Sequence, residues 1–255
     1  MMKLGVLFLR EFTIYGKNSI FLIILGVIST AFLWLATSPE TFYDYADALP
    51  IAFAMACAAM LIGLMMSINL VCKDYHMIRR ELRMTISASS IILSKTFMII
   101  FFSLIMSAVL IIPYFMNSYR IDGQNTLYLY LAVFFTMLAS AQIGLMVSTF
   151  VRDKTQVAAL SIPFVMLYKI LFSGFVFEQV QLDNADTFAI SNYSIRAIGS
   201  ALRFDHEHFG WDTPYGVFRN TIENAFANLG ALAAFVIVSM VAAIFALWLI
   251  DKKGW

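Results

Sequence analysis

Six apolar runs, each 20 residues or longer, constrain this chain more than any other feature of its sequence. A helix needs about 20 apolar residues to cross the hydrocarbon core of a bilayer, which is about 30 Å thick. Only 13% of the residues are charged and 61% are hydrophobic, so polar side chains are too few to cover a water-soluble globule. The sequence therefore predicts an all-α polytopic membrane protein in which residues 1–255 form one transmembrane domain. Its six expected spans are residues 18–37, 49–72, 94–116, 127–150, 156–177 and 228–250.

The distribution of lysine and arginine predicts the orientation of these spans. If the N-terminus is cytoplasmic, twelve of the seventeen cations lie in cytoplasmic segments, four lie in outer segments and Lys169 lies inside a span. By the positive-inside rule, both termini then face the cytoplasm. We expect the membrane to be a plasma membrane, and the bacterial inner membrane in particular. The twelve are Lys3, Arg10, Lys17, Lys73, Arg79, Arg80, Arg83, Lys95, Arg152, Lys154, Lys252 and Lys253, and the four are Arg120, Arg196, Arg203 and Arg219.

The segment before the first span has two contrasting faces. Lys3, Arg10 and Lys17 repeat every seven residues. Apolar and aromatic residues fall near the opposite face of a helix drawn through them. This pattern predicts an amphipathic helix lying in the cytoplasmic interface, and a simple extension of the first span is the alternative. The apolar set is Leu4, Leu7, Phe8, Phe12 and Tyr15.

Motifs for catalysis are missing from the chain. The pair Gly16-Lys17 has neither the upstream glycine nor the following Ser or Thr of a phosphate-binding loop, so this motif cannot bind ATP here. No H-E-x-x-H, C-x-x-C or G-x-S-x-G pattern occurs either. We therefore expect no catalytic residue, no metal site and no cofactor on this chain, and we expect no nucleic-acid partner.

The expected fifth span carries the one cation inside an apolar run. Lys169 lies near its midpoint, and Pro163 removes a backbone hydrogen bond and favours a kink. A lysine at the centre of a bilayer costs at least about 2.5 kcal/mol, so such residues are functional candidates. Lys169 either contacts substrate or gates the pathway, or it pairs with a polar group such as Gln142 or a tyrosine hydroxyl and fixes helix packing.

Methionine and aromatic side chains of the second and fifth spans are candidates for a substrate cavity. Both kinds of side chain repack around varied ligands, which suits a hydrophobic or amphipathic cargo. Ordinary membrane core is the alternative for any one of them. The candidate cavity residues are Met55, Met65, Phe164, Tyr168, Lys169, Phe172 and Phe175, with Met60 and Met66 nearby in the second span.

Small residues recur every three or four positions in three of the spans. Such stripes let helix backbones approach closely in lipid, where no hydrophobic effect drives association. They predict close packing within the bundle or between two copies. The stripes are Ala52, Ala56, Ala59, Gly63 and Ser67; Ser140, Gly144 and Ser148; and Ala227, Gly230, Ala231 and Ala234.

The first cytoplasmic loop, CKDYHMIRRELRMTISASSIILSK over residues 72–95, is long and cationic. Its first part predicts an amphipathic helical extension of span two. Thr85 is a candidate N-cap for a short helical turn before Lys95 opens span three. A loop that only set the topology would need a few cations and a tight turn. Its length therefore favours a docking surface, whereas a positive-inside anchor accounts for the charge alone.

The expected large outer loop, residues 178–227, includes the stretch SIRAIGSALRF. Its apolar residues Ile195, Ile198, Ala201 and Leu202 have helical spacing. Aromatic residues follow at Trp211 and later, and aromatic side chains favour the membrane interface. We expect short re-entrant or surface helices in this loop.

Three motifs resemble the permeases of type-2 ATP-binding-cassette (ABC) exporters, and the G-subfamily-like ones most closely. Arg80-Glu81 is followed fourteen residues after the glutamate by Lys95, and ASSIILSK stands at the position of the family's small helix. LFSGFVF, residues 171–177, is similar to the family's end of span five. SNYSIRAI, residues 191–198, is similar to an element of its outer loop.

This resemblance implies a function and partners. In that family the first inner loop couples to a nucleotide-binding subunit, so ATP and Mg are expected on a separate chain and not on this one. It implies a transmembrane subunit that dimerises with itself or a similar chain and exports a lipid, drug or peptide. An ion-coupled secondary transporter and a non-transporting membrane assembly protein are the alternatives. The residues implied in coupling are Arg80, Glu81, Ser87, Ser89, Ser90 and Lys95.

Overall fold

The protein is described here by a computed structural model, which covers residues 10–13, 20–38, 45–83, 86–117, 123–150, 190–202 and 221–253. Every regular element in these residues is helical, which confirms the predicted all-α class. Residues 10–13 are also helical. The longer elements are α2 (Ile20–Ala36), α3 (Tyr45–Ser67), α4 (Tyr75–Arg83), α5 (Ala88–Asn117), α6 (Gly123–Phe150), α8 (Ile190–Ala201) and α10 (Ile222–Lys253).

Four of these helices, α3, α5, α6 and α10, are long and apolar enough to cross a membrane. They correspond to the expected second, third, fourth and sixth spans. α2 corresponds to the first, and its apolar part, Leu22–Ala36, is shorter. The expected fifth span, residues 156–177, lies outside the described residues, as does most of the loop that follows it.

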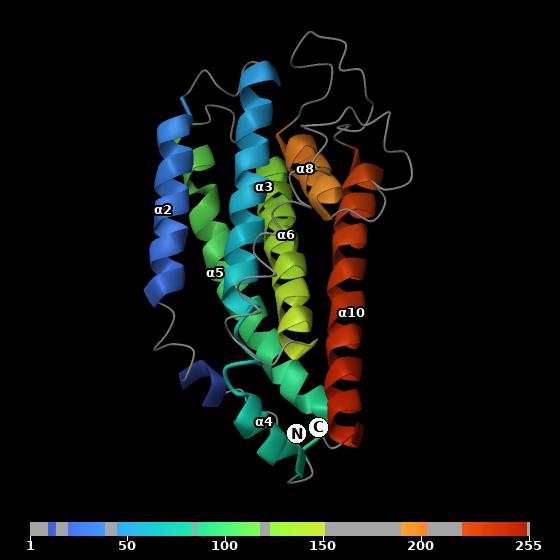
Figure 1. The fold of residues 1–255 in the computed structure, drawn as a ribbon. Helices are drawn as coiled ribbons and strands as arrows, with labels where there is room; N and C mark the ends of the chain where they lie inside the picture. The colour runs from blue at the N-terminus through green and yellow to red at the C-terminus, as the bar shows by residue number, and fades with distance from the viewer. Residues whose placement is uncertain are drawn as a thin grey trace.

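The long helices lie side by side, with α6 near the centre of the bundle (Figure 1). α6 packs most extensively against α3 and α10. α4 lies at one end of the bundle, and α8 lies beside α6 and α10 toward the other (Figure 1). We call these the α4 end and the α8 end.

The backbones of α3 and α6 approach each other closely. A Cβ atom added at Gly63 would overlap the carbonyl oxygen of Met137, and one added at Gly144 would overlap the hydroxyl of Ser67. The Ser140 hydroxyl donates to the carbonyl oxygen of Met60 at 2.6 Å. The small residues of these two spans therefore permit close backbone approach, as their spacing predicts.

The third small-residue stripe behaves differently. A Cβ atom at Gly230 would meet no heavy atom within 4 Å. Ala227 and Ala234 are exposed. Within this chain these residues of α10 do not pack inside the bundle, because α10 turns a different face toward α6. The buried residues of that face include Asn228, Leu232, Ser239, Ala243 and Leu247. Packing of the stripe between two copies stays a prediction.

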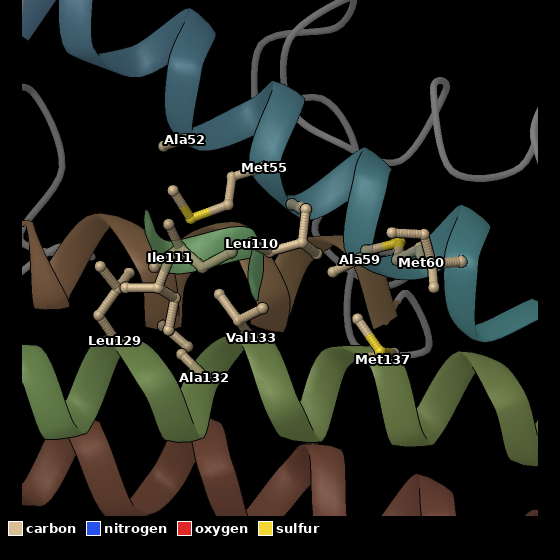
Figure 2. Packing of buried hydrophobic residues seen from close by; sticks show 14 of the residues in the cluster. Ala52, Met55, Ala59, Met60, Leu110, Ile111, Leu129, Ala132, Val133 and Met137 are labelled. Carbon is tan, nitrogen blue, oxygen red and sulfur yellow. The ribbon is translucent and has the colours of Figure 1, made fainter. Parts of the chain in front are cut away.

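Large apolar side chains fill the space between α3, α5 and α6 (Figure 2). Met55 and Met60 extend from α3 toward Leu110 and Val133, and all four are buried. In lipid such packing stabilises mainly through van der Waals contact, because the alternative environment is equally apolar.

The amphipathic helix predicted in the first part of the loop is present as α4, but the prediction that it continues span two is wrong, because the chain leaves the helical path after α3. α3 ends at Ser67, and residues 68–74 form turns before α4 begins. The Ser148 hydroxyl accepts hydrogen bonds from the backbone N–H groups of Val71 and Cys72, at 3.1 and 3.2 Å. These bonds supply partners for backbone groups that a continuous helix would have satisfied internally.

The start of α5 also differs from the expectation. Helix α5 begins at Ala88 and continues without a break through Lys95, so the predicted separate turn forms its first residues. Ser87 occupies the N-cap, because the backbone N–H of Ser90 lies 3.4 Å from the Ser87 hydroxyl. Thr85, the expected cap, lies outside the described residues.

Candidate functional site at the α4 end

A fully buried lysine lies at the α4 end. Lys95 has a relative exposure of 0%, and its Nζ lies 3.1 Å from Glu11 Oε2 and 3.1 Å from Asp74 Oδ2. Glu11 belongs to the N-terminal helical residues, Asp74 precedes α4, and Lys95 belongs to α5. One ammonium group therefore joins three segments that are far apart in the sequence.

A second cation extends this cluster. Arg10 donates from Nη2 to Glu11 Oε1 at 2.7 Å, and its Nη1 pairs with Glu81 Oε1. Glu81 is buried and lies on α4. The five side chains form a continuous chain of ion pairs from α4 through Arg10 and Glu11 to α5. We call this set, Arg10, Glu11, Asp74, Glu81 and Lys95, the ionic cluster.

Apolar contacts hold the N-terminal helical residues in this position. The ring of Phe12 meets the ring of Phe101 edge-on at 5.6 Å and stacks on Phe102 at 6.5 Å. Such pairs contribute about 0.5–1.5 kcal/mol each beyond the area they bury. The packing of Phe12 on α5 places its neighbour Glu11 beside Lys95.

The fold of α4 supplies the other carboxylates. The carbonyl oxygen of Asp74 accepts a bond from the N–H of Ile78 at 2.9 Å, which starts the helix. Ile78 and Glu81 lie three residues apart and are the buried residues of α4. This spacing puts an apolar side chain and a carboxylate on the same inward face.

Each charged side chain of the ionic cluster depends on the others for a partner of opposite charge. A buried charge without a partner loses its hydration and regains nothing, so removing one member of a buried pair costs about 3–5 kcal/mol. The cluster contains two cations and three carboxylates, and Lys95 has carboxylates from two segments. We therefore expect the segments to move together when any one of them moves.

The exposed side of the α4 end is positively charged. Arg80 and Arg83 of α4 are exposed, as is Lys73 just before it. All three carboxylates of the cluster are turned inward. The surface presented by the loop is therefore cationic, and it is not neutralised by the acids that accompany it in the sequence.

The serines after α4 border this surface. Ser87 and Ser89 are exposed and Ser90 is half-buried. Their hydroxyls bond to one another, Ser87 to Ser90 at 2.8 Å and Ser89 to Ser87 at 3.2 Å. The expected coupling residues thus separate into two groups. Arg80 and the serines lie at or near the surface, whereas Glu81 and Lys95 are buried.

Three members of the cluster were not expected from the sequence. Arg10 appeared there only as a cation of the amphipathic segment, Glu11 was not singled out, and Asp74 appeared only as part of a loop. One signal was present for Glu11, because it is the only acidic residue before Glu40 and follows a cation directly. Its partner could not be identified, since Lys95 lies 84 positions away.

The structure describes Met55 and Met65 but not the other expected cavity residues. Met55 is buried in the core between α3 and α6, and Met65 is partly buried against the same core. Phe164, Tyr168, Lys169, Phe172 and Phe175 lie outside the described residues. Gln142, the suggested partner of Lys169, is buried, and neither of its amide atoms has a hydrogen-bond partner among the described residues. The cavity remains a prediction.

Comparison with known proteins identifies the family. The family description "ABC-2 type transporter" matches residues 2–186, well over half of the chain. A search of curated proteins finds no match. The matched region contains α2 to α6, three of whose helices are long and apolar enough to span a membrane. The chain therefore belongs to the ABC-2 type transporter family and is an integral membrane protein, the permease subunit of an ABC transporter.

Proposed function

We propose that this permease is half of an exporter that moves a hydrophobic or amphipathic substrate out of the cytoplasm. Permeases of this family work with a separate ATP-binding subunit, and that subunit would bind ATP and Mg and hydrolyse the nucleotide. The observation that carries the proposal is the ionic cluster, which ties the surface loop at the α4 end to α5.

The exposed face of α4 and the following serines are the docking surface in this proposal. A push on α4 reaches Glu81, then Arg10 and Glu11, and then Lys95 on α5. Asp74 provides a second connection from the start of α4 to Lys95. Because each ion pair is costly to break, displacement of the loop moves α5 in preference to separating the charges.

The complete transporter contains two permease copies and two ATP-binding subunits. Both termini and the α4 end face the cytoplasm, and the membrane is the bacterial inner membrane. ATP binding favours one arrangement of the two copies over another. The cargo must bind these two arrangements with different affinity if the cycle is to be driven.

A lipid, drug or peptide is the proposed class of cargo. Met55 is buried between helices, so it contacts cargo only when α3 and α6 or α5 move apart. Lys169 would bind an anionic group of the cargo if it faces the pathway. The same movement that opens the core would thus expose the adaptable methionines.

Copurification tests the partnership. The permease is purified from its native membrane with any protein bound to it and is reconstituted in lipid vesicles. We expect an ATP-binding protein to copurify and the complex to hydrolyse ATP. If no ATP-binding protein copurifies, the exporter is excluded, and a secondary transporter or an assembly protein takes its place.

Substitution of Glu81 tests the transmission. Glu81→Gln removes the charge that holds Arg10 and changes the volume little. We expect cargo-dependent stimulation of ATP hydrolysis to fall at least tenfold while the subunits still copurify. Glu223→Gln is the matched control, because Glu223 lies in the first turn of α10 at the α8 end. Equal behaviour of the two variants would contradict transmission through the cluster.

A further inference from the structure

The chain between α4 and α5 turns back on itself at the α4 end (Figure 1). Asp74, just before α4, and Lys95 of α5 are in contact, so the chain leaves this point along α4 and returns to it along the first residues of α5. The backbone N–H of Ile86 donates to the carbonyl oxygen of Glu81 at 3.2 Å, which closes the turn between the two helices. We call the exposed residues around this turn the tip: Arg80, Arg83, Ser87 and Ser89.

The exposed apolar side chains of α5 mark where the hydrocarbon core ends. Among the described residues of α5, large apolar side chains are exposed from Phe97 to Met116 and not before Phe97. At 1.5 Å per residue this length is about 28 Å, which matches the thickness of a hydrocarbon core. Ser89 and Ser87 precede Phe97 by about 12 and 15 Å on the same scale. The headgroup layer occupies only about 5–8 Å on each side, so the tip extends past it into water.

The tip is cationic, and acids of this chain are too few to neutralise it. Arg80 and Arg83 are exposed and form no ion pair with a described residue. The segments that we expect on the cytoplasmic side contain twelve cations and five acids, and three of these acids belong to the ionic cluster. The other two, Asp153 and Asp251, each have a lysine beside them in the sequence. The two arginines therefore remain available to a partner.

The position of these arginines favours a protein partner over lipid headgroups. A cation that only anchored the chain to the membrane would lie at headgroup depth. Lys73 meets this description, because its neighbour Asp74 contacts Lys95, only two residues before Phe97. The tip lies farther out. Exposed arginines in water pair well with carboxylates, which they can bind through two parallel hydrogen bonds.

We propose that the tip docks on an acidic surface of the ATP-binding subunit, where carboxylates pair with Arg80 and Arg83. The inference rests on the proposed function, because that subunit is the partner assigned to the α4 end. Arg80 is exposed, and the next residue, Glu81, is buried in the ionic cluster. A partner carboxylate bound to Arg80 therefore acts one residue away from the first ion pair of the cluster. Complementary charge also orients the two subunits as they associate.

Charge reversal tests the docking. The complex is purified from its native membrane and placed in nanodiscs of uncharged phosphatidylcholine, and the ATP-binding subunit is removed and titrated back. Salt screens exposed charges, so we expect weaker association of the wild-type subunits at high salt than at low salt. Arg83→Glu should weaken association at low salt at least about tenfold and reduce its dependence on salt. Lys73→Glu is the matched control, since it reverses an exposed cation at headgroup depth, and it should leave the affinity unchanged.

Cross-linking identifies the partner's groups without reversing any charge. Arg80→Lys and Arg83→Lys keep the positive charge and supply an amine, which a carbodiimide joins to a carboxylate in direct contact. We expect mass spectrometry to find peptides that link position 80 or 83 to Asp or Glu of the ATP-binding subunit. Native Lys73 should give no such peptide. An assembled complex without links from either position would overturn the proposal.

The outcomes separate this inference from the export function. If an ATP-binding subunit copurifies and hydrolyses ATP, but Arg83→Glu behaves like Lys73→Glu, the acidic docking surface is refuted and the exporter remains. The arginines would then be membrane anchors. If no ATP-binding subunit copurifies, the exporter and the docking surface are refuted together.

Discussion

The buried polar groups at the two ends of the bundle differ in charge. At the α4 end, five charged side chains form ion pairs with one another. At the α8 end, the buried polar side chains of α8 are uncharged and include Ser191, Asn192, Ser194 and Ser200. Separating a buried ion pair costs more than breaking a hydrogen bond between neutral groups, so the ion pairs link their segments more firmly.

The seam between α3 and α6 runs between these ends. There the backbones meet at Gly63 and Gly144, and Ser140 bonds to the Met60 carbonyl. This packing depends on small volume and not on charge. Variants at the two ends and at the seam should therefore differ in size and even in sign.

Loss of Lys95 should have the largest effect. Lys95→Met leaves Asp74 without its cation and Glu11 with Arg10 alone, and the expected cost is about 3–5 kcal/mol. Thermal unfolding of the purified permease in detergent, monitored by intrinsic fluorescence, measures it. Lys73→Met is the control, because Lys73 is exposed. Unfolding midpoints that agree for these two variants would show that the buried ion pairs contribute nothing.

A methyl group at the seam should have the next largest effect. Gly63→Ala pushes a Cβ against the backbone of Met137, and overpacking of this kind costs about 1–3 kcal/mol. Gly230→Ala is the matched control, because nothing lies within 4 Å there. Alanine favours helix by up to about 1 kcal/mol over glycine, so the control should be neutral or stabilised. Destabilisation by both would mean that general helix effects, and not the seam, were measured.

The pair Arg10 and Glu81 should show direct coupling. A double-mutant cycle with Arg10→Ala, Glu81→Ala and both together should give an interaction energy within about 0.5–3 kcal/mol. Chemical denaturation in detergent supplies the four free energies. A cycle pairing Arg10 with Glu223, at the far end, should give zero. Additive effects of Arg10 and Glu81 would remove this pair from the transmission path.

The smallest effects are expected from alanine substitutions of two buried serines. Ser140→Ala loses the bond to Met60, and such bonds inside membranes average about 0.6 kcal/mol. Ser200→Ala removes a buried hydroxyl that has no hydrogen-bond partner among the described residues, so it should not destabilise the purified protein and should raise its unfolding midpoint slightly. Differential scanning fluorimetry compares them. Equal destabilisation would show that Ser200 is bonded after all.

Much of this fold was predictable because membrane helices follow from composition. Apolar runs of sufficient length predicted the positions of α3, α5, α6 and α10, although their ends differ by several residues. The errors occurred where tertiary contacts act. Ser148 stabilises the turns after α3 from 76 and 77 positions away, and no local pattern of residues indicates that contact.

The candidate site was predictable only in part. Resemblance to a family motif selected Arg80, Glu81 and Lys95. It did not predict the environment of these side chains. A buried lysine and an exposed arginine look alike in a sequence, since burial depends on which segments fold over them. The partners of Lys95 come from residues 11 and 74 and meet it only in the folded chain.

By itself the sequence determined the membrane class, the helical content and the absence of a phosphate-binding loop, because these depend on local composition and spacing. Tertiary structure alone decided that the acids of the α4 end turn inward and that its exposed cations face outward. It also decided that α6, α8 and α10 pack against one another. Such juxtapositions arise when helices distant in sequence pack together, and no single segment encodes them.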